Sequence, residues 1–167
     1  MASRSIDDLD LAFRPLARKF LEECKVTAPW QTFITDGYRS FEEQAILYAK
    51  GRTTPGPIVT NAKPGESWHN FGLAIDCAFQ MDGKLSYALE HYNKIVPIAK
   101  RLGMEWGGDW ASFPDKPHFQ WHPGITLADA RKGARPVIID PNTDTLTDDQ
   151  KRAIDVLEKF RTAEGHG

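Results

Sequence analysis

Two short stretches of this chain carry residue types that bind metals and move protons. The first contains His69 and Asp76, and the second contains Asp115 and His118. Two neutral imidazoles and one carboxylate can hold zinc and leave a fourth position for water, whose pKa zinc lowers to roughly 7. Asp115 could take a proton from this water and pass it to a leaving amine. The residue types therefore suit metal-assisted hydrolysis.

The first stretch runs into a predicted strand at 73–79. Alternation places its bulky residues on one face and Asp76, flanked by two alanines, on the other, which leaves space above the carboxylate. His69 lies in the loop before this strand, and Gly72 gives the backbone the freedom to bring that loop close. The strand therefore points a carboxylate toward the same region as a histidine.

The second stretch ends in the last predicted strand, 117–121, where His118 and Gln120 share one face. If the two strands pair, His118 meets His69 and Asp76 at one point. Taken singly, the two histidines also fit roles without a metal. His69 could be a surface loop residue and His118 a packed core residue, whereas a buried Asp76 requires a cation, a hydrogen-bond network or a metal.

The remaining pattern predicts an α+β protein with a small antiparallel sheet flanked by helices. Ser40 and Glu43 form a predicted capping box, and Pro15 is expected to split the first helix. The predicted helices are 5–25, 41–50 and 87–102, the further strands are 30–36 and 104–106, and a long loop covers 52–66. We expect a catalytic domain at 1–135, followed at 136–167 by a linker and an amphipathic helix near 148–160.

The bulk composition is that of an ordinary globular chain. It has 167 residues, 41% of them hydrophobic, and a net charge of −2, which gives no general attraction to nucleic acid. No apolar run approaches the ~20 residues of a membrane helix, and the acidic start does not resemble a signal peptide. We therefore expect synthesis in the cytoplasm. Cys24 and Cys77 are expected to be buried free thiols rather than a disulfide framework.

Four segments, in the same order, resemble the zinc peptidoglycan peptidases. This family includes D-alanyl-D-alanine carboxypeptidases, vancomycin-resistance dipeptidases and phage L-alanyl-D-glutamate endopeptidases. The segments are Gly37-Tyr38-Arg39-Ser40 with Gln44, Ser67-x-His69-x-x-Gly72-x-Ala74-x-Asp76, Trp106-Gly107-Gly108-Asp109-Trp110, and Asp115-x-x-His118.

The resemblance implies a hedgehog/D-Ala-D-Ala-peptidase-like zinc site with one zinc ion per chain. His69, Asp76 and His118 would be its ligands, and Asp115 the catalytic base and later acid. Arg39 would bind a substrate carboxylate or stabilise the oxyanion formed on water attack, unless it forms only a surface salt bridge.

Several further residues have a less specific expectation. Outer hydrogen-bonding or substrate-binding roles are expected for Ser67, Gln44 and Trp68, with a loop cap as the alternative for Ser67. Four tryptophans could line a substrate groove: Trp68, Trp106, Trp110 and Trp121. Core packing is expected for at least two of them. Histidines expected outside the ligand set are His91, solvated on a helix, His122, on the opposite strand face from His118, and His166, near the end of the chain.

The resemblance predicts hydrolysis of a peptide bond in the peptidoglycan stem. Asp at position 115 and the Trp-Gly-Gly segment favour the L-alanyl-D-glutamate endopeptidase branch. Alternatives are a D-alanyl-D-alanine carboxypeptidase and a non-catalytic zinc-binding module. By analogy, we expect a monomeric phage endolysin that binds the stem peptide, not nucleic acid, and acts on the cell wall after release.

Overall fold

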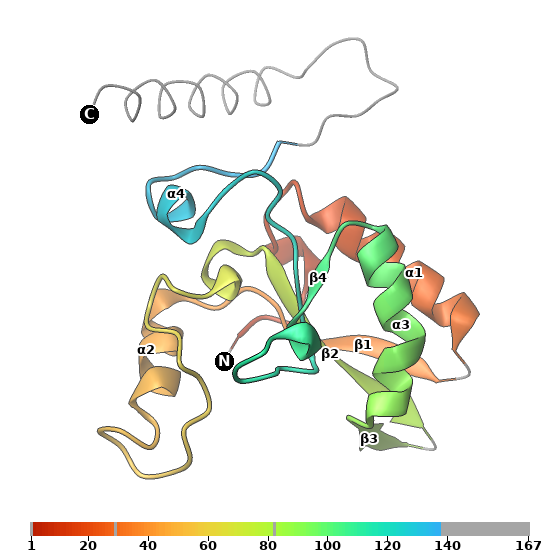
Figure 1. Ribbon diagram of the computed structural model, residues 1–167, viewed down its shortest axis with the longest axis horizontal. Coiled ribbons are helices and arrows are strands. Elements are labelled where there is room, and N and C mark those ends of the chain that lie inside the picture. Colours follow the sequence, from red (N-terminus) through yellow and green to blue (C-terminus); the bar gives the residue numbers. More distant parts are fainter. Residues whose placement is uncertain (1, 29, 82, 138–167) are drawn as a thin grey trace. The chain divides into compact units, whose positions relative to one another are not determined.

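The computed structural model describes residues 2–28, 30–81 and 83–137 (Figure 1). The chain divides into two compact units, Met1–Trp121 and His122–Gly167. The helix expected near 148–160 and His166 lie outside the described residues, so the domain boundary near Arg135 stays a prediction. Within the described part, no helix has the length and hydropathy needed to cross a membrane.

The first unit begins with a short 3-10 helix, η1 (Ile6–Asp8), and a separate helix, α1 (Arg14–Thr27). The Ser5 side chain accepts a hydrogen bond from the Asp7 amide at the start of η1. The segment predicted at 5–25 is therefore divided, as expected, although the division comes before Pro15 and not at it. Pro15 lies in the first turn of α1, where a missing N–H costs nothing, so it starts this helix instead of interrupting it.

The sheet is antiparallel and has the order β1-β2-β5-β4, with β3 paired to β2. Its strands are β1 (Gln31–Asp36), β2 (Ala74–Met81), β3 (Lys84–Ser86), β4 (Glu105–Trp106) and β5 (His118–Gln120). The sequence pattern located all of these except β3, where it predicted no strand. The predicted α+β class with a small antiparallel sheet is confirmed.

Strand alternation separates a core face of the sheet from the face that carries the candidate site. On the core face, the Phe79 ring lies 4.8 Å from the Tyr92 ring, and the Tyr92 hydroxyl donates to the Cys77 carbonyl at 2.8 Å. Phe119 of β5 packs against Phe20 of α1, with ring centroids 5.3 Å apart. Figure 1 shows α1 and α3 (Leu89–Arg101) as neighbouring helices. Asp76 and His118 therefore project from the opposite face.

Helix α2 (Phe41–Ala49) follows the predicted pattern, because Ser40 and Glu43 form a capping box. In α3, Pro97 lies inside the helix. His91, expected to be solvated, is 5% exposed and packs against Trp30 and Phe79, with ring centroids 4.1 and 5.2 Å away. That expectation was wrong because the aromatic neighbours belong to other elements. Trp30 directly precedes β1, and Phe79 lies in β2.

Both cysteines are buried free thiols, as predicted. Burial raises the pKa of Cys24 to about 12 and that of Cys77 well above its usual value. A buried protonated thiol is a poor nucleophile, so neither cysteine is suited to catalysis.

The described part of the second unit contains one further helix, α4 (Leu127–Arg131), which the sequence pattern did not identify. Thr126 and Asp129 form a capping box at its start. At five residues the helix has too few turns to show a hydrophobic period, so only the capping residues could have revealed it.

Candidate metal centre

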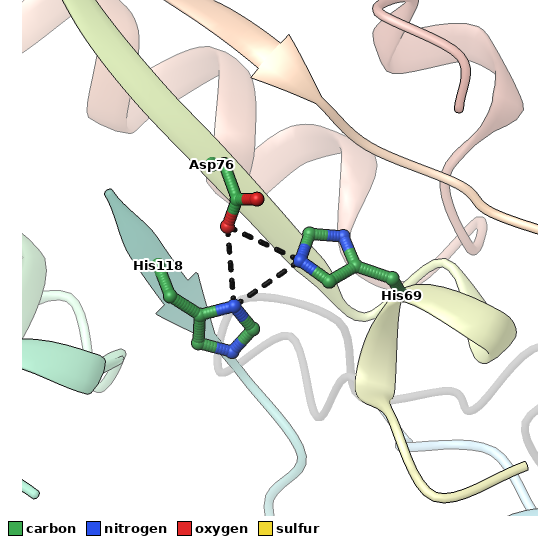
Figure 2. Close-up of side chains that lie close together, drawn as sticks. All are labelled: His69, Asp76 and His118. Atoms are coloured by element: carbon green, nitrogen blue, oxygen red, sulfur yellow. Dashed lines mark hydrogen bonds and ion pairs between the residues drawn. The ribbon is translucent and has the colours of Figure 1, made fainter. Parts of the chain in front are cut away.

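Three potential ligands converge from two strands and a turn (Figure 2). Asp76 in β2 and His118 in β5 are directly paired across the antiparallel ladder. His69 lies in the 3-10 helix η2 (Trp68–Phe71), which ends at Gly72 with a φ of 67°. A Cβ at Gly72 would lie 2.6 Å from the Asp10 amide nitrogen, so this turn requires glycine.

The facing atoms form a nearly equilateral triangle. His69 Nε2 lies 3.1 Å from His118 Nδ1, and each nitrogen lies 3.2 Å from Asp76 Oδ1. Ligands held at about 2.0–2.1 Å by a tetrahedral ion are about 3.3 Å apart, within a few tenths of an ångström of this triangle. The His69 and His118 side chains are 3% and 7% exposed, and the Asp76 side chain is 17% exposed. The donor set and spacing therefore fit a tetrahedral ion such as zinc.

The outer nitrogen of each histidine has a partner that fixes its proton. His69 Nδ1 donates to the Gly37 carbonyl at 2.7 Å, and His118 Nε2 donates to Gln120 Oε1 at 2.9 Å. Gln120 Nε2 in turn donates to Glu105 Oε2 at 2.8 Å. Such outer partners select the tautomer of a metal-binding histidine. Both inner nitrogens are consequently left without protons in the neutral rings.

Three lone pairs facing one another require a cation between them. Burial alone would raise the pKa of Asp76, but the charge of a protonated His69 and the hydrogen bonds that the two rings donate when they are protonated hold it well below its usual value. Burial lowers the pKa of His118, yet the hydrogen bond and charge of Asp76 outweigh burial and raise it. The cluster therefore attracts a proton, and the same field attracts a metal ion.

Arg39 lies beside this cluster and is 7% exposed, so it does not form a surface salt bridge. Its guanidinium donates to Asp36 at 2.9 Å and to Gln44 at 3.0 Å, and it approaches the second oxygen of Asp76 to 4.0 Å. Gln44, fully buried, also donates to the Ala62 carbonyl at 2.8 Å. The upstream motif therefore connects the cluster to the long loop.

Asp115 lies in the turn before His118 and is partly buried. Its amide donates to the Gly107 carbonyl at 2.9 Å, and its own carbonyl accepts from the His118 amide at 3.3 Å. A Cβ at Gly107 would lie 2.6 Å from the Asp115 carbonyl oxygen and 3.0 Å from His118 Cβ. Burial and the Asp76 charge raise the pKa of Asp115, against opposing effects of the nearby histidines and Arg39. A carboxyl group with a raised pKa suits proton transfer.

The other predicted residues are placed less directly. No side-chain bond from Ser67 caps η2. Trp68 is 7% exposed and packs near Phe71 at 6.2 Å between ring centroids. Trp110 is 36% exposed, and its ring lies 5.1 Å from that of His118. Of the four tryptophans, Trp110 is therefore the exposed one beside the cluster, and Trp68 belongs to the core.

The two other tryptophans stack on aromatic rings of the first unit. Trp121 stacks on Phe13 at 6.1 Å, and Trp106 on Tyr92 at 6.5 Å. His122 lies outside the His69–Asp76–His118 group, and its Nδ1 lies 3.2 Å from the Ile125 carbonyl oxygen.

Sequence reasoning missed the Glu105–Gln120 pair that orients His118. Strand alternation placed Gln120 on the same face as His118, and this was the sequence signal for Gln120. Glu105 lies in β4, and only the register of β4 with β5 brings it opposite Gln120.

We predict that Gln120→Leu weakens metal binding by about 10–100-fold, because His118 would lose the acceptor that fixes its tautomer. Isothermal titration with zinc measures this affinity. Gln80→Leu, an exposed glutamine near the end of β2, is the matched control and should bind zinc as the wild type does. Unchanged affinity in Gln120→Leu would contradict a role of the outer pair in metal binding.

Comparison with known proteins adds evidence that is independent of this geometry. Residues 60–121 match a family model described as D-alanyl-D-alanine carboxypeptidase. The family resemblance predicted from the motifs is confirmed. The matched segment contains all three clustered residues and Asp115.

Two curated relatives are similar to this chain. The peptidoglycan L-alanyl-D-glutamate endopeptidase CwlK of Bacillus subtilis (strain 168) is 50% identical over 100 residues, which cover 54% of this chain and 60% of CwlK. The L-alanyl-D-glutamate peptidase of Listeria phage A118 is 39% identical over 59 residues, which cover 34% of this chain and 21% of the phage protein. The matched segments thus span less than two thirds of either relative.

Solved structures share the fold. The Serratia marcescens L-Ala D-Glu endopeptidase ChiX has a TM-score of 0.52 at 24% identity, covering 78% of this chain and 92% of ChiX. The zinc complex of the vancomycin-resistance D,D-pentapeptidase VanY, as an E175A mutant, has a TM-score of 0.50 at 20% identity, covering 74% and 76%. These matches support the predicted D-Ala-D-Ala-peptidase-like fold.

Proposed function

We propose that this chain is a zinc metallopeptidase that hydrolyses the L-alanyl-D-glutamate bond of the peptidoglycan stem. The observation that carries the proposal is the triangle of three unprotonated acceptors from His69, Asp76 and His118, 3.1–3.2 Å apart, with Asp115 in the turn beside it. One zinc ion per chain is proposed at this triangle.

A bound zinc ion would supply an activated water at neutral pH and polarise the carbonyl of the scissile bond. Asp115 accepts one proton from the attacking water as its oxygen bonds to the carbonyl carbon. The same carboxyl then delivers that proton to the amide nitrogen as the carbon–nitrogen bond breaks, which yields a carboxylic acid and an amine. The new acid then loses its remaining proton to solvent and leaves as a carboxylate. Arg39, beside Asp76, adds positive charge near the oxyanion or a substrate carboxylate.

The choice of bond rests on the relatives. The matching family model is described as a carboxypeptidase, whereas CwlK and the phage protein are both named for the L-alanyl-D-glutamate bond. The 50% identity to CwlK and the Asp at position 115 favour the endopeptidase. The phage relative supports an endolysin role. Action on the cell wall as a monomer, after synthesis in a host cytoplasm, is part of the same proposal.

The test is digestion of purified muropeptides and intact cell walls, followed by mass spectrometry, with and without a chelator. We expect products cut between L-alanine and D-glutamate, no products with chelator, and recovery when zinc is restored. Release of D-alanine alone would establish the carboxypeptidase alternative. Zinc binding without any cleavage would establish the non-catalytic module.

A further inference from the structure

A cavity of about 460 Å³ lies beside the candidate metal centre. This volume is within the range of small-molecule sites and suits a short peptide segment. The cavity lies between the N-terminal segment and α2, and its lining includes Arg4, Asp36, Arg39, Ile46, Leu47 and Lys50.

The cavity and the metal centre share the Asp36–Arg39 ion pair. The Arg39 guanidinium contacts Asp36 at 2.9 Å and lies 4.0 Å from Asp76 Oδ2. Asp36 is also the cross-strand partner of Asp76 in the β1–β2 ladder. Asp36 and Arg39 therefore connect the lining of the cavity to the metal centre.

The lining carries three cationic side chains, Arg4, Arg39 and Lys50, and two carboxylates, Asp36 and Glu43. Asp36 pairs with Arg39, and the Glu43 carboxylate accepts from the Ser40 amide in the capping box. Within the described residues, no ion pair or side-chain hydrogen bond is present for Arg4 or Lys50. Arg39 Nε is buried and likewise has no hydrogen-bond partner there. An unpaired buried donor beside two free cations indicates an anionic ligand.

We propose that this cavity binds the D-glutamyl side of the stem peptide and recognises its free α-carboxylate through Lys50 and Arg4. In the stem, D-glutamate continues through its γ-carboxyl group, so the α-carboxylate is free and sits on the carbon that bears the leaving nitrogen. Ile46 and Leu47 contact the aliphatic part of this residue. This inference rests on the proposed function and adds a specificity determinant to it.

The test compares two stem substrates that differ in one charge, one with D-glutamate and one with its α-amide, D-isoglutamine. We expect the zinc-loaded wild type of 167 residues to cleave the D-glutamate substrate with the lower KM. Lys50→Ala and Arg4→Ala should each raise that KM by about twofold to fivefold, with kcat nearly unchanged, since partly exposed charge contacts are of modest strength. Both variants should leave KM for the amidated substrate unchanged.

Two further variants and a binding measurement separate recognition from folding. Lys50→Arg keeps the charge and should retain the low KM, and Lys94→Ala removes an exposed lysine of α3 and should behave as the wild type. Calorimetry with the product peptide γ-D-glutamyl-L-lysine should show the same loss of affinity in Lys50→Ala. If the wild type cleaves both substrates with equal KM and Lys50→Ala changes neither, the cavity assignment is wrong while the proposed function stands. If the wild type cleaves neither, both fall.

Discussion

Asp115→Asn is expected to reduce kcat for stem cleavage by about 10²–10⁴-fold while zinc remains bound. Asparagine has nearly the same shape but cannot accept a proton from the attacking water or return one to the leaving amine. The backbone contacts that hold this turn, from the Asp115 amide to Gly107 and from the His118 amide to Asp115, do not depend on the side chain. Steady-state cleavage of a defined muropeptide, with zinc content measured on the same sample, tests both halves of the prediction.

Asp109→Asn is the matched control. Asp109 lies in the same connection but forms an exposed ion pair with Lys100 at 2.7 Å, so its loss should change kcat by less than about threefold. Full activity in Asp115→Asn would contradict the assignment of this carboxyl group as the proton carrier. Loss of zinc together with activity would instead give it a structural role.

The sequence allowed the centre of this site to be predicted because its geometry is local and periodic. Strand alternation placed Asp76 on the face of the sheet opposite to that of the buried Cys77. Antiparallel pairing of β2 with β5 then brought His118 next to Asp76. The Ser40–Glu43 capping box could also be predicted, because the residues that form it lie within four positions of one another. Helix α2 was located to within a few residues by this signal, whereas α4, which has a similar capping box, was missed because it is only five residues long.

The parts that were missed depend on contacts between distant segments. The burial of His91 depends on Trp30, which no helical period reveals. The partner of Gln120 comes from β4, and the cavity beside Arg39 depends on how the N-terminal segment packs near α2. A three-residue strand such as β3 is too short for alternation to identify.

Asp76→Asn is expected to abolish cleavage and to lower zinc affinity by more than about 10–100-fold, the loss typical when a hydrogen-bond partner of a metal ligand is mutated. Asparagine removes the negative charge that attracts the ion, although two imidazoles remain. In the wild type, zinc at 1,000 times its Kd should stabilise the fold by about 4 kcal/mol, which corresponds to a rise in Tm of about 8–16 °C. In Asp76→Asn the same zinc concentration should give only a small rise. Calorimetric titration and thermal denaturation with and without zinc measure the two effects.

The pH dependence provides a second, independent signature of Asp76. Zinc needs His118 unprotonated, and the carboxylate raises the pKa of this imidazole despite its burial. Wild-type affinity should therefore fall as the pH drops through this raised pKa and level off above it. Without the carboxylate, the pKa of His118 loses its main upward influence, so the residual affinity of Asp76→Asn should begin to fall only at lower pH. Asp36→Asn, which neutralises the neighbouring carboxylate on β1, should retain the wild-type pH profile. If it weakened zinc binding as much as Asp76→Asn does, general negative charge rather than direct ligation would account for the affinity.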